Sequence, residues 1–562
     1  MIRDQIQDSL KNTDVGEMEL EHPEDIAHGD FASSVALKRA SQEGGNPREI
    51  AQDIVASLEE ELPSSIEKVE IAGPGFINLF LSADILRDEV DAIRSKGSEY
   101  GYIGGEESEK IIIEYTDPNP FKVFHIGHLM SNTIGESLSR LLEFSGAEVL
   151  RANYQGDVGM HIAMAVWGVR QLEDEMPAGS DSLEKRVDFL GRAYAHGAKL
   201  YEENDEIRTE IEAVNKKIYE GGDEEITNLY TWGREISLEK FEYLYQILGT
   251  KFDKYFFESE VADAGKEVVL EGLERDIFER SEGAVVYRGE KDGLHTRVFV
   301  NSQGIPTYEA KELALAREKY EWVEYDRSIV VTANEINEYF KVVLSAMSKL
   351  FPDLAMRTEH VSHGFLRLPT GKMSSRTGNI ISGEELLEEV IARTEAKMSD
   401  RDIPNDEREL IARKVAVAAI KYSILKQSAG SDIVFDIEKS LSFEGDSGPY
   451  LQYTYVRTQS VLEKARNEGY EIGGEAVGEV TEVERMLYRF PEIVERSLHE
   501  RSPHYVIRYL TDLASCFNSY YGSTQIVSDE EGVGYRLALT DAVGVVLKNG
   551  LYLLGIETVD RM

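Results

Sequence analysis

Residues 110–128 read KIIIEYTDPNPFKVFHIGH and contain the features that decide the fold. The run IIIEY is short and rich in β-branched residues, which favours a buried parallel strand. A loop follows, and the pattern predicts a helix from about Gly127 to Phe144, closed by Ser145 and Gly146. A second strand begins with EVLRANY at residue 148. The order strand, helix, strand predicts one right-handed βαβ unit of a nucleotide-binding fold.

Two histidines, His125 and His128, stand where this helix is predicted to begin. The free N–H groups of a helix N-terminus bind phosphate, and Gly127 lets a nucleotide approach the backbone closely. Histidines placed there can donate hydrogen bonds to phosphate oxygens as negative charge develops in a transition state. Two plain surface histidines at a helix start are the alternative. A metal pair is disfavoured, because no carboxylate follows at ligand spacing.

A second string, GKMSSRTGN at residues 371–379, lies between the strand-like LRLP and a predicted helix. Small residues around Lys372 indicate a mobile loop that can place an ammonium group on a phosphate. Taken alone, such a string is more often a solvated loop.

We expect several domains, because one hydrophobic core rarely organises a chain of 562 residues. Residues 1–105 are expected to form a small α+β domain, residues 106–380 a catalytic domain with a Rossmann-like parallel sheet, and residues 381–562 an all-α bundle. A long charged stretch at about 165–285 is expected to be a helical insertion in the sheet domain. The predicted fold class is therefore α/β with a helical C-terminal part.

The composition predicts a cytoplasmic, salt-adapted protein. No apolar run is long enough for a membrane span, and MIRDQIQDSL lacks the layout of a signal peptide. The single cysteine, Cys516, rules out an intrachain disulfide and a multi-cysteine zinc site. The formal net charge is −43, from 104 acidic and 61 basic residues, and a hydrophobic fraction of 42% argues against disorder. We interpret the charge as an acidic surface screened by molar salt.

Together, in this order and at the edges of a split sheet, the two strings resemble the HIGH and KMSKS signatures of class I aminoacyl-tRNA synthetases. Flanking stretches narrow the resemblance to the arginyl family: YQGDVG after the second strand, PTYEAKE at 306–312, DSGPYLQYTYVR at 446–457 and the ending LKNGLYLLGIETVDRM. AHGDFASSVALKRA and VEIAGPGFIN look like that family's additional N-terminal domain. The resemblance covers nearly the whole chain and is weakest at 165–285.

The resemblance implies an enzyme that activates L-arginine with ATP and attaches it to tRNA(Arg). It implies Mg²⁺ bound to the ATP substrate and no tightly bound metal or organic cofactor. We also expect a monomer, and the net charge of −43 indicates a halophilic archaeon as the source. The N-terminal domain is expected to contact the D-loop of the tRNA, and the C-terminal bundle its anticodon.

The resemblance also implies site residues, position by position. Those expected to stabilise phosphate charge are His125, His128, Lys372 and Lys122. Gly127, Met373 and Ser374 are expected to bind ATP as well. The residues expected to bind arginine are Glu114, Asn119, Tyr308, Glu312 and Glu335. Those expected to contact tRNA are Phe76, Asn78, Tyr453, Phe517 and Met562. A guanidinium favours planar pairing with carboxylates, which agrees with the acids in the arginine set.

The sequence departs from the family pattern in two places. Ser375 stands where the second lysine of the KMSKS loop is expected, and we infer that Lys122 replaces the missing positive charge. The amide and histidine expected near Asn334 to Tyr339 are absent, and Glu335 is assigned in their place.

Three alternatives were considered. A glutamyl or cysteinyl enzyme is disfavoured by the missing zinc cysteines and by the acids at positions 114 and 312. A nucleotidyltransferase of small metabolites would share the histidine loop but would not need the helical C-terminal part. A tRNA-binding paralogue without activity is disfavoured by the intact histidines and Lys372.

Overall fold

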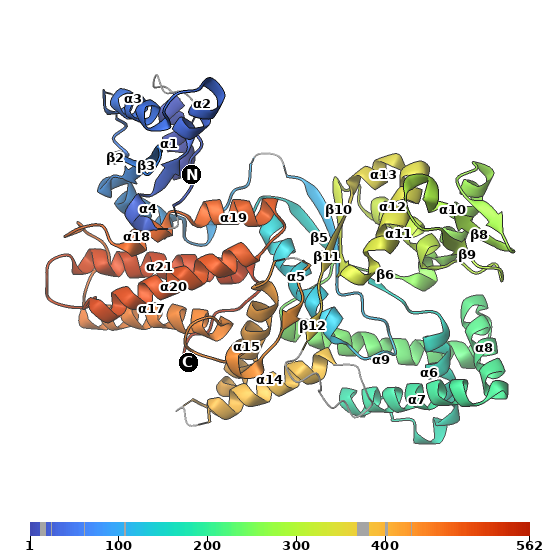
Figure 1. Ribbon diagram of the computed structural model, residues 1–562. Helices are drawn as coiled ribbons and strands as arrows, with labels where there is room; N and C mark the ends of the chain where they lie inside the picture. The colour runs from blue at the N-terminus through green and yellow to red at the C-terminus, as the bar shows by residue number, and fades with distance from the viewer. Residues whose placement is uncertain are drawn as a thin grey trace.

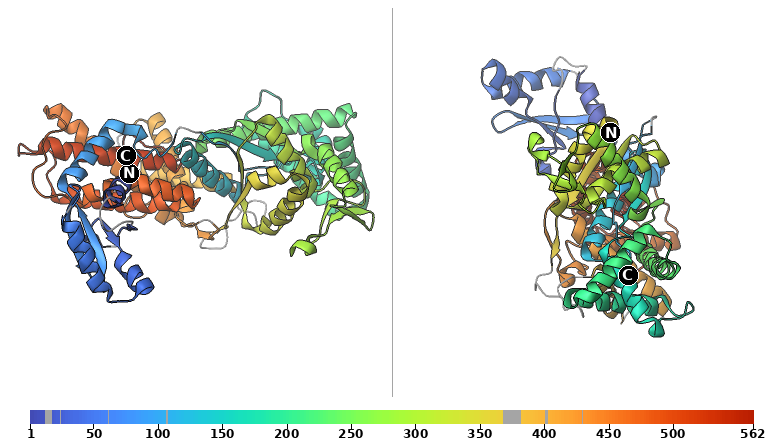
Figure 2. Two further views of the ribbon diagram at one scale, coloured as in Figure 1. Left: turned by 90° about the horizontal axis from the view of Figure 1, so that it is seen from above. Right: turned by 90° about the vertical axis from the view of Figure 1, so that its right-hand side faces the viewer.

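The computed structural model describes residues 1–11, 18–23, 25–60, 62–105, 108–367, 382–399, 403–428 and 430–562. The molecule is elongated, with a helical bundle at one end, inserted helices at the other and a parallel sheet between them (Figures 1 and 2). The N-terminal domain projects from the bundle end. Among the described residues, no helix is both long and apolar enough to cross a membrane.

The centre of the molecule is a five-stranded parallel sheet with the strand order β11-β10-β4-β5-β6. Its strands are β4 (Lys110–Glu114), β5 (Glu148–Gln155), β6 (Lys254–Phe257), β10 (Arg327–Ala333) and β11 (Thr358–His363). Helix α5 (Ile126–Glu143) connects β4 to β5. The βαβ unit predicted from the sequence is therefore confirmed, and β4 occupies the middle of the sheet.

The insertion between β5 and β6 consists of four helices: α6 (Met160–Gln171), α7 (Leu183–Glu203), α8 (Asp205–Glu220) and α9 (Glu224–Leu248). The chain returns to the parallel sheet at β6, earlier than the predicted insertion of 165–285 allows. This strand was missed because KYFF is only four residues long and has no β-branched run.

The segment after β6 forms a lobe beside the sheet (Figure 1). It contains helix α10 (Glu258–Glu274) and a separate antiparallel sheet of β7 (Glu279–Ser281), β8 (Ala284–Tyr287) and β9 (Arg297–Val300). The remaining helices are α11 (Tyr308–Trp322), α12 (Asn337–Leu350) and α13 (Pro352–Arg357). Helices α10 and α11 pack against each other, and α10 begins directly after β6, the neighbour of β5 in the sheet.

The C-terminal bundle begins after the short strand β12 (Leu366–Arg367), which pairs with β13 (Ile433–Val434). Its helices are α14 (Gly383–Lys397), α15 (Asn405–Leu425), α16 (Ile437–Ser440), α17 (Gly448–Glu468), α18 (Glu482–Leu487), α19 (Phe490–His499), α20 (His504–Ser523) and α21 (Val533–Leu553). Helix α5 packs against α14, α15, α19 and α21, so one continuous hydrophobic core joins the sheet to the bundle.

The N-terminal domain is an antiparallel sheet with helices on it and a core of its own. Its elements are α1 (Ile2–Lys11), β1 (Phe31–Ser33), α2 (Val35–Glu43), α3 (Pro47–Glu60), β2 (Ile66–Ala72), β3 (Phe76–Leu81) and α4 (Ala83–Lys96). Helix α4 packs against α21 and α18 of the bundle. The fully buried carboxylate of Asp30 pairs with Arg485, which fixes the domain to the bundle.

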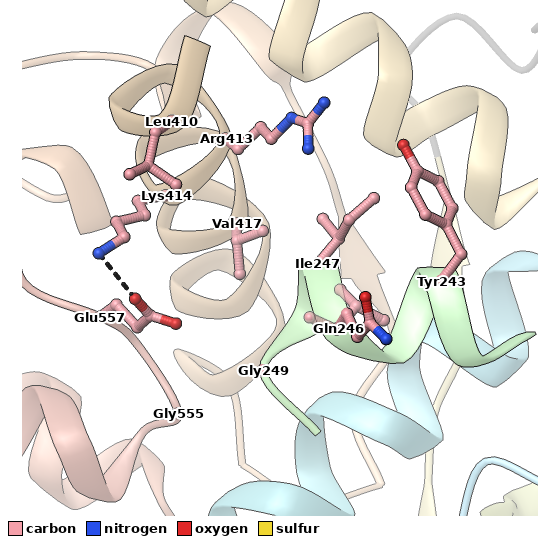
Figure 3. Close-up of a pocket in the computed structure, with 11 residues that line it drawn as sticks. Tyr243, Gln246, Ile247, Gly249, Leu410, Arg413, Lys414, Val417, Gly555 and Glu557 are labelled. Carbon is pink, nitrogen blue, oxygen red and sulfur yellow. Dashed lines mark ion pairs between the residues drawn. The ribbon is translucent and has the colours of Figure 1, made fainter. Parts of the chain in front are cut away.

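A buried lysine ties the inserted helix α9 to the bundle. Lys421 of α15 is fully buried and donates to the carbonyl oxygens of Leu248 (2.6 Å) and Gly555 (2.7 Å). Burial lowers the pKa of Lys421 to about 7. A pocket of about 210 Å³ lies beside this junction, between the end of α9, α15 and the C-terminal segment, where Lys414 pairs with Glu557 at 2.9 Å (Figure 3). Its lining contains none of the residues predicted for the catalytic site.

Candidate active site and tRNA interface

The loop between β4 and α5 is held in an uncommon backbone conformation. Three non-glycine residues have positive φ angles: Thr116 (79°), Asp117 (46°) and Phe121 (65°). Such residues cost about 1–3 kcal/mol each and persist only where their surroundings fix them. The backbone N–H of Phe121 donates to Ser237 at 2.9 Å, and the carboxylate of Asp117 accepts the backbone N–H of Tyr154 at 2.8 Å. The insertion and β5 therefore hold the loop that leads to the histidines.

The two histidines cap the N-terminus of α5. The Nδ1 atom of His125 accepts the backbone N–H of Gly127, and the Nδ1 atom of His128 accepts the backbone N–H of His125, both at 3.1 Å. Their rings stack with centroids 3.4 Å apart. Burial, together with neighbouring positive charge, lowers the pKa of both rings, so both are neutral at pH 7. A neutral ring whose Nδ1 accepts a hydrogen bond carries its proton on Nε2, which leaves two parallel N–H donors.

Lys122 lies between these histidines and an acidic group of side chains. It is exposed, yet loss of hydration in the cleft lowers its pKa, an effect opposed by the carboxylate of Glu258. Its charge in turn lowers the pKa of His125 and His128. The location agrees with the predicted role of Lys122 at the phosphates, because a cation there faces the histidine donors and the acidic side chains together.

The predicted residues Lys372, Met373 and Ser374 lie outside the described residues. The chain re-enters the described structure beside the histidines. Ser382 forms an isolated antiparallel bridge with His125, and the N–H of Gly383 donates to the carbonyl of Phe124 at 2.8 Å. Ser382 and Gly383, which follow the second string in the sequence, therefore lie beside the first string.

A group of buried carboxylates lies at the carboxyl end of β4. Glu114, the last residue of β4, pairs with Lys319 of α11, and both side chains are buried. Glu312, two helical turns before Lys319, is also buried, and burial together with the charge of Glu114 raises its pKa to about 8. Burial and the charge of Glu114 also raise the pKa of Asp117. Glu114 therefore has a cation within the chain, whereas Glu312 keeps its proton at neutral pH.

A second buried ion pair belongs to this group of side chains. Glu258, the first residue of α10, accepts a hydrogen bond from Lys311 at 2.7 Å. The ammonium of Lys311 also lies 5.2 Å from the ring of Tyr308, which is 60% exposed at the start of α11. The side-chain oxygen of Asn119 accepts the backbone N–H of Gly156 at 3.0 Å. The structure thus gathers four of the five predicted arginine residues around one group of buried charged side chains.

Glu335 is the exception. It lies in a short 3-10 helix, Asn334–Ile336, and is exposed. Tyr339, about one turn further along, lies closer to the acidic group. Burial and the charges of Glu312 and Glu309 raise the pKa of its hydroxyl. The assignment of Glu335 to arginine binding is not supported by its position.

The bundle contains a second pocket, of about 410 Å³, near the C-terminus. Its lining includes Tyr453, Arg457 and Met562, so two of the predicted tRNA residues lie together. Phe517 does not join them, because it is fully buried in the core, and a direct stacking contact with RNA does not agree with this burial. Tyr521, one turn later on α20, is 42% exposed instead. The guanidinium of Arg457 lies 4.8 Å from the ring centroids of both Tyr453 and Tyr521.

The two residues of the N-terminal domain that were predicted to contact RNA differ in their solvent exposure. Phe76 is 40% exposed at the start of β3, as a stacking surface requires. Asn78 is only 4% exposed, because β3 is the middle strand and position 78 pairs with Ala32 on one side and Glu70 on the other. A direct RNA contact by Asn78 does not agree with this burial.

A parallel sheet whose first helix is capped by two histidines is typical of class I aminoacyl-tRNA synthetases. Residues 89–437 match the family "tRNA synthetases class I (R), catalytic domain", residues 451–562 the "DALR anticodon binding domain" and residues 1–81 the "Arginyl tRNA synthetase N terminal domain".

Full-length comparisons agree. The arginine–tRNA ligase of Exiguobacterium sp. is 33% identical over 545 residues, covering 97% of this chain and 95% of the relative. That of Bacillus anthracis is 32% identical over 548 residues with the same coverage. The structure of Thermus thermophilus arginyl-tRNA synthetase superposes with a TM-score of 0.81 at 25% identity, covering 100% of both chains. The chain therefore belongs to the arginyl-tRNA synthetase family, which removes the glutamyl, cysteinyl and nucleotidyltransferase alternatives.

Several site residues were missed from the sequence. Lys319 could have been found, because seven residues from Glu312 is two helical turns and places both side chains on one face of α11. Tyr521 follows Phe517 by one turn, but the sequence does not indicate which of the two rings faces the core. Glu258 had no local signal, because it follows the unpredicted strand β6.

Proposed function

We propose that this chain activates L-arginine with Mg·ATP and transfers it to the terminal adenosine of tRNA(Arg). One observation carries the proposal: the two histidine N–H donors and the buried carboxylates lie at opposite sides of the same β4–α5 loop. An anionic nucleotide and a cationic amino acid can therefore meet there. Charging of tRNA(Arg) with arginine tests the proposal.

The reaction begins with in-line attack of the arginine carboxylate on the α-phosphate, which releases pyrophosphate. The Nε2–H groups of His125 and His128 donate to the phosphate oxygens as charge develops, and Lys122 adds a positive charge between them and the amino acid. We assign the same task to Lys372, with Met373 and Ser374 beside it in sequence. The 2′-hydroxyl of the terminal adenosine of the tRNA then attacks the carbonyl carbon of the arginyl-adenylate, which forms the ester and releases AMP. Positioning and electrostatics supply the catalysis, and no covalent enzyme intermediate is needed.

The charges of the cleft favour a singly charged cation. Glu114 and Glu312 bring two negative charges when both are ionised, and Lys319 supplies one positive charge. Glu258 and Lys311 neutralise each other. One unmatched negative charge remains, which the guanidinium of arginine balances, while the exposed ring of Tyr308 offers it a flat surface. We assign Asn119 to this subsite because its side chain is fixed by Gly156 at the same cleft.

The tRNA is proposed to contact both ends of the molecule. We assign the D-loop to Phe76 of the N-terminal domain and the anticodon to Tyr453, Tyr521, Arg457 and Met562 of the bundle. Stacking on aromatic and guanidinium surfaces is the usual way to read unpaired bases. The proposed domains remain 1–105, 106–380 and 381–562. Because one chain supplies every group named above, we propose that the enzyme acts as a monomer. We place it in the cytoplasm.

We further propose that the enzyme works in molar salt, as in halophilic archaea. The support is the net charge of −43 alone, since the relatives compared above are bacteria. In dilute buffer such a charge repels itself and the tRNA, and salt removes this repulsion.

We expect tRNA affinity and charging rate to stay level or rise between about 0.2 and 3 M KCl, as the Debye length falls from ~7 to ~2 Å. Unfolding at the low end, followed by circular dichroism, is expected in the same series. Phosphate contacts alone would give the opposite trend, because counterion release weakens them steeply with salt. A stable, fully active enzyme at 0.2 M whose tRNA binding collapses above 1 M would contradict salt adaptation.

A further inference from the structure

The hydroxyl of Tyr154, near the end of β5, is buried and has no hydrogen-bond partner among the residues that the structure describes. Buried hydroxyl groups nearly always have a partner, because burial without one loses the hydrogen bonds that water would supply. A buried hydroxyl without a partner in a native protein therefore needs an explanation, and one explanation is a ligand that binds beside it.

The position of Tyr154 points to the arginine cleft. In the parallel pair of β4 and β5, Glu114 lies opposite Ala152. Side chains two residues apart on a strand share a face, so Tyr154 lies on the face of the sheet that carries Glu114. Its ring packs with Phe256 and Leu315 under α11. Burial raises the pKa of the Tyr154 hydroxyl, and the negative charges of Glu258, Glu312 and Glu114 raise it further.

The backbone of the same residue is already part of the site. The N–H of Tyr154 donates to the carboxylate of Asp117 in the strained loop, at 2.8 Å. Gly156, two residues after Tyr154, lies very close to two side chains of the site. A Cβ atom at position 156 would lie 3.0 Å from a carboxylate oxygen of Glu258 and 2.5 Å from the side-chain oxygen of Asn119. The backbone that carries the phenol is therefore fixed beside the site.

We propose that Tyr154 is a positioning residue of the arginine subsite, and that its hydroxyl donates to the carboxylate of Glu312 once the guanidinium of arginine is bound. This inference rests on the proposed role of Glu312. An ionised carboxylate has about four acceptor sites, and a paired guanidinium occupies two of them. The phenol supplies a further donor from the opposite side and so fixes the plane in which Glu312 meets the substrate.

The test is Tyr154→Phe, which keeps the ring and removes only the hydroxyl. We expect the melting temperature of the free protein to stay the same or rise, because an unsatisfied polar atom is lost. The arginine dissociation constant, measured by calorimetry on the full chain, should increase about tenfold, as for the loss of a hydrogen bond to a charged group, with ATP affinity unchanged. Tyr245→Phe is the matched control. The Tyr245 hydroxyl is likewise buried without a partner among the described residues, but Glu114, Glu258 and Glu312 are not among the causes that raise its pKa, so its loss should leave arginine affinity unchanged.

Glu312→Gln, alone and combined with Tyr154→Phe, separates the two proposals. If the hydroxyl acts through Glu312, Tyr154→Phe should have no further effect in the Glu312→Gln background. A Tyr154→Phe variant that melts earlier and binds arginine normally would overturn the inference and make the hydroxyl structural. If the Glu312→Gln variant itself binds arginine normally, Glu312 does not bind the guanidinium, and the proposed positioning role of Tyr154 is then also wrong.

Discussion

Replacing Glu312 by glutamine is expected to weaken arginine binding by roughly 2–4 kcal/mol, or about 30- to 1,000-fold. The carboxylate is buried, and without its charge the cleft has one positive charge too many when the guanidinium enters beside Lys319. ATP affinity should hardly change, because the phosphates bind at the histidine end of the loop. Calorimetric titration with arginine and, separately, with ATP measures both.

The pH dependence of arginine binding identifies the same group. In the free protein the pKa of Glu312 is about 8, so below that pH binding must first remove a proton. Arginine affinity should therefore rise from pH 6 to pH 8 and level off above, and the Glu312→Gln variant should lose this slope. Glu321→Gln, at an exposed position of the same helix, is the control. A variant at position 312 that still discriminates canavanine and lysine from arginine as before would show that Glu312 does not read the guanidinium.

Replacing His128 by alanine is expected to lower the charging rate by about 10²–10³, the usual effect of losing one preorganised donor to a developing anion. Arginine affinity should remain, because the ring faces the phosphates. The alanine variant also loses the cap that Nδ1 provides to the backbone N–H of His125, at a cost of about 1 kcal/mol of stability.

His128→Asn separates these two effects. Asparagine keeps an acceptor close to the position of Nδ1 but has no donor at the position of Nε2. It should restore the melting temperature and leave the rate low. A His128→Asn enzyme with the wild-type rate would mean that His128 only caps α5. His125→Asn is expected to behave in the same way, because its Nδ1 accepts the N–H of Gly127.

The sequence was most informative where structure is local. The run IIIEY, the histidine pair and the following strand predicted the middle of the sheet and the helix that carries the donors, because strand and helix periodicities differ clearly there. The strand β6 escaped because four residues are too few for a period. The antiparallel strands β8 and β9 lie outside the parallel sheet, and nothing in their sequences indicated this separation.

The site was predicted only in part, because its internal contacts are not local in the sequence. The resemblance gave the residues of the cleft one by one, but not their partners inside the chain. The pairing of Glu114 with Lys319, and that of Glu258 with Lys311, depend on the register between strands and helices that are far apart in sequence. Burial was the other obstacle: Phe517 and Asn78 have suitable chemistry for RNA, and only packing shows that both face inwards.

The most direct measurement of the central claim is the charging of tRNA(Arg) by the full chain with each of the twenty amino acids, in KCl concentrated enough to keep the protein folded. Once Glu312 is ionised, one negative charge has no partner within the chain and lies beside a fixed set of phosphate donors, so arginine alone should be charged. Charging of lysine or glutamate at a comparable rate, or no charging of arginine by the folded protein, would contradict the account.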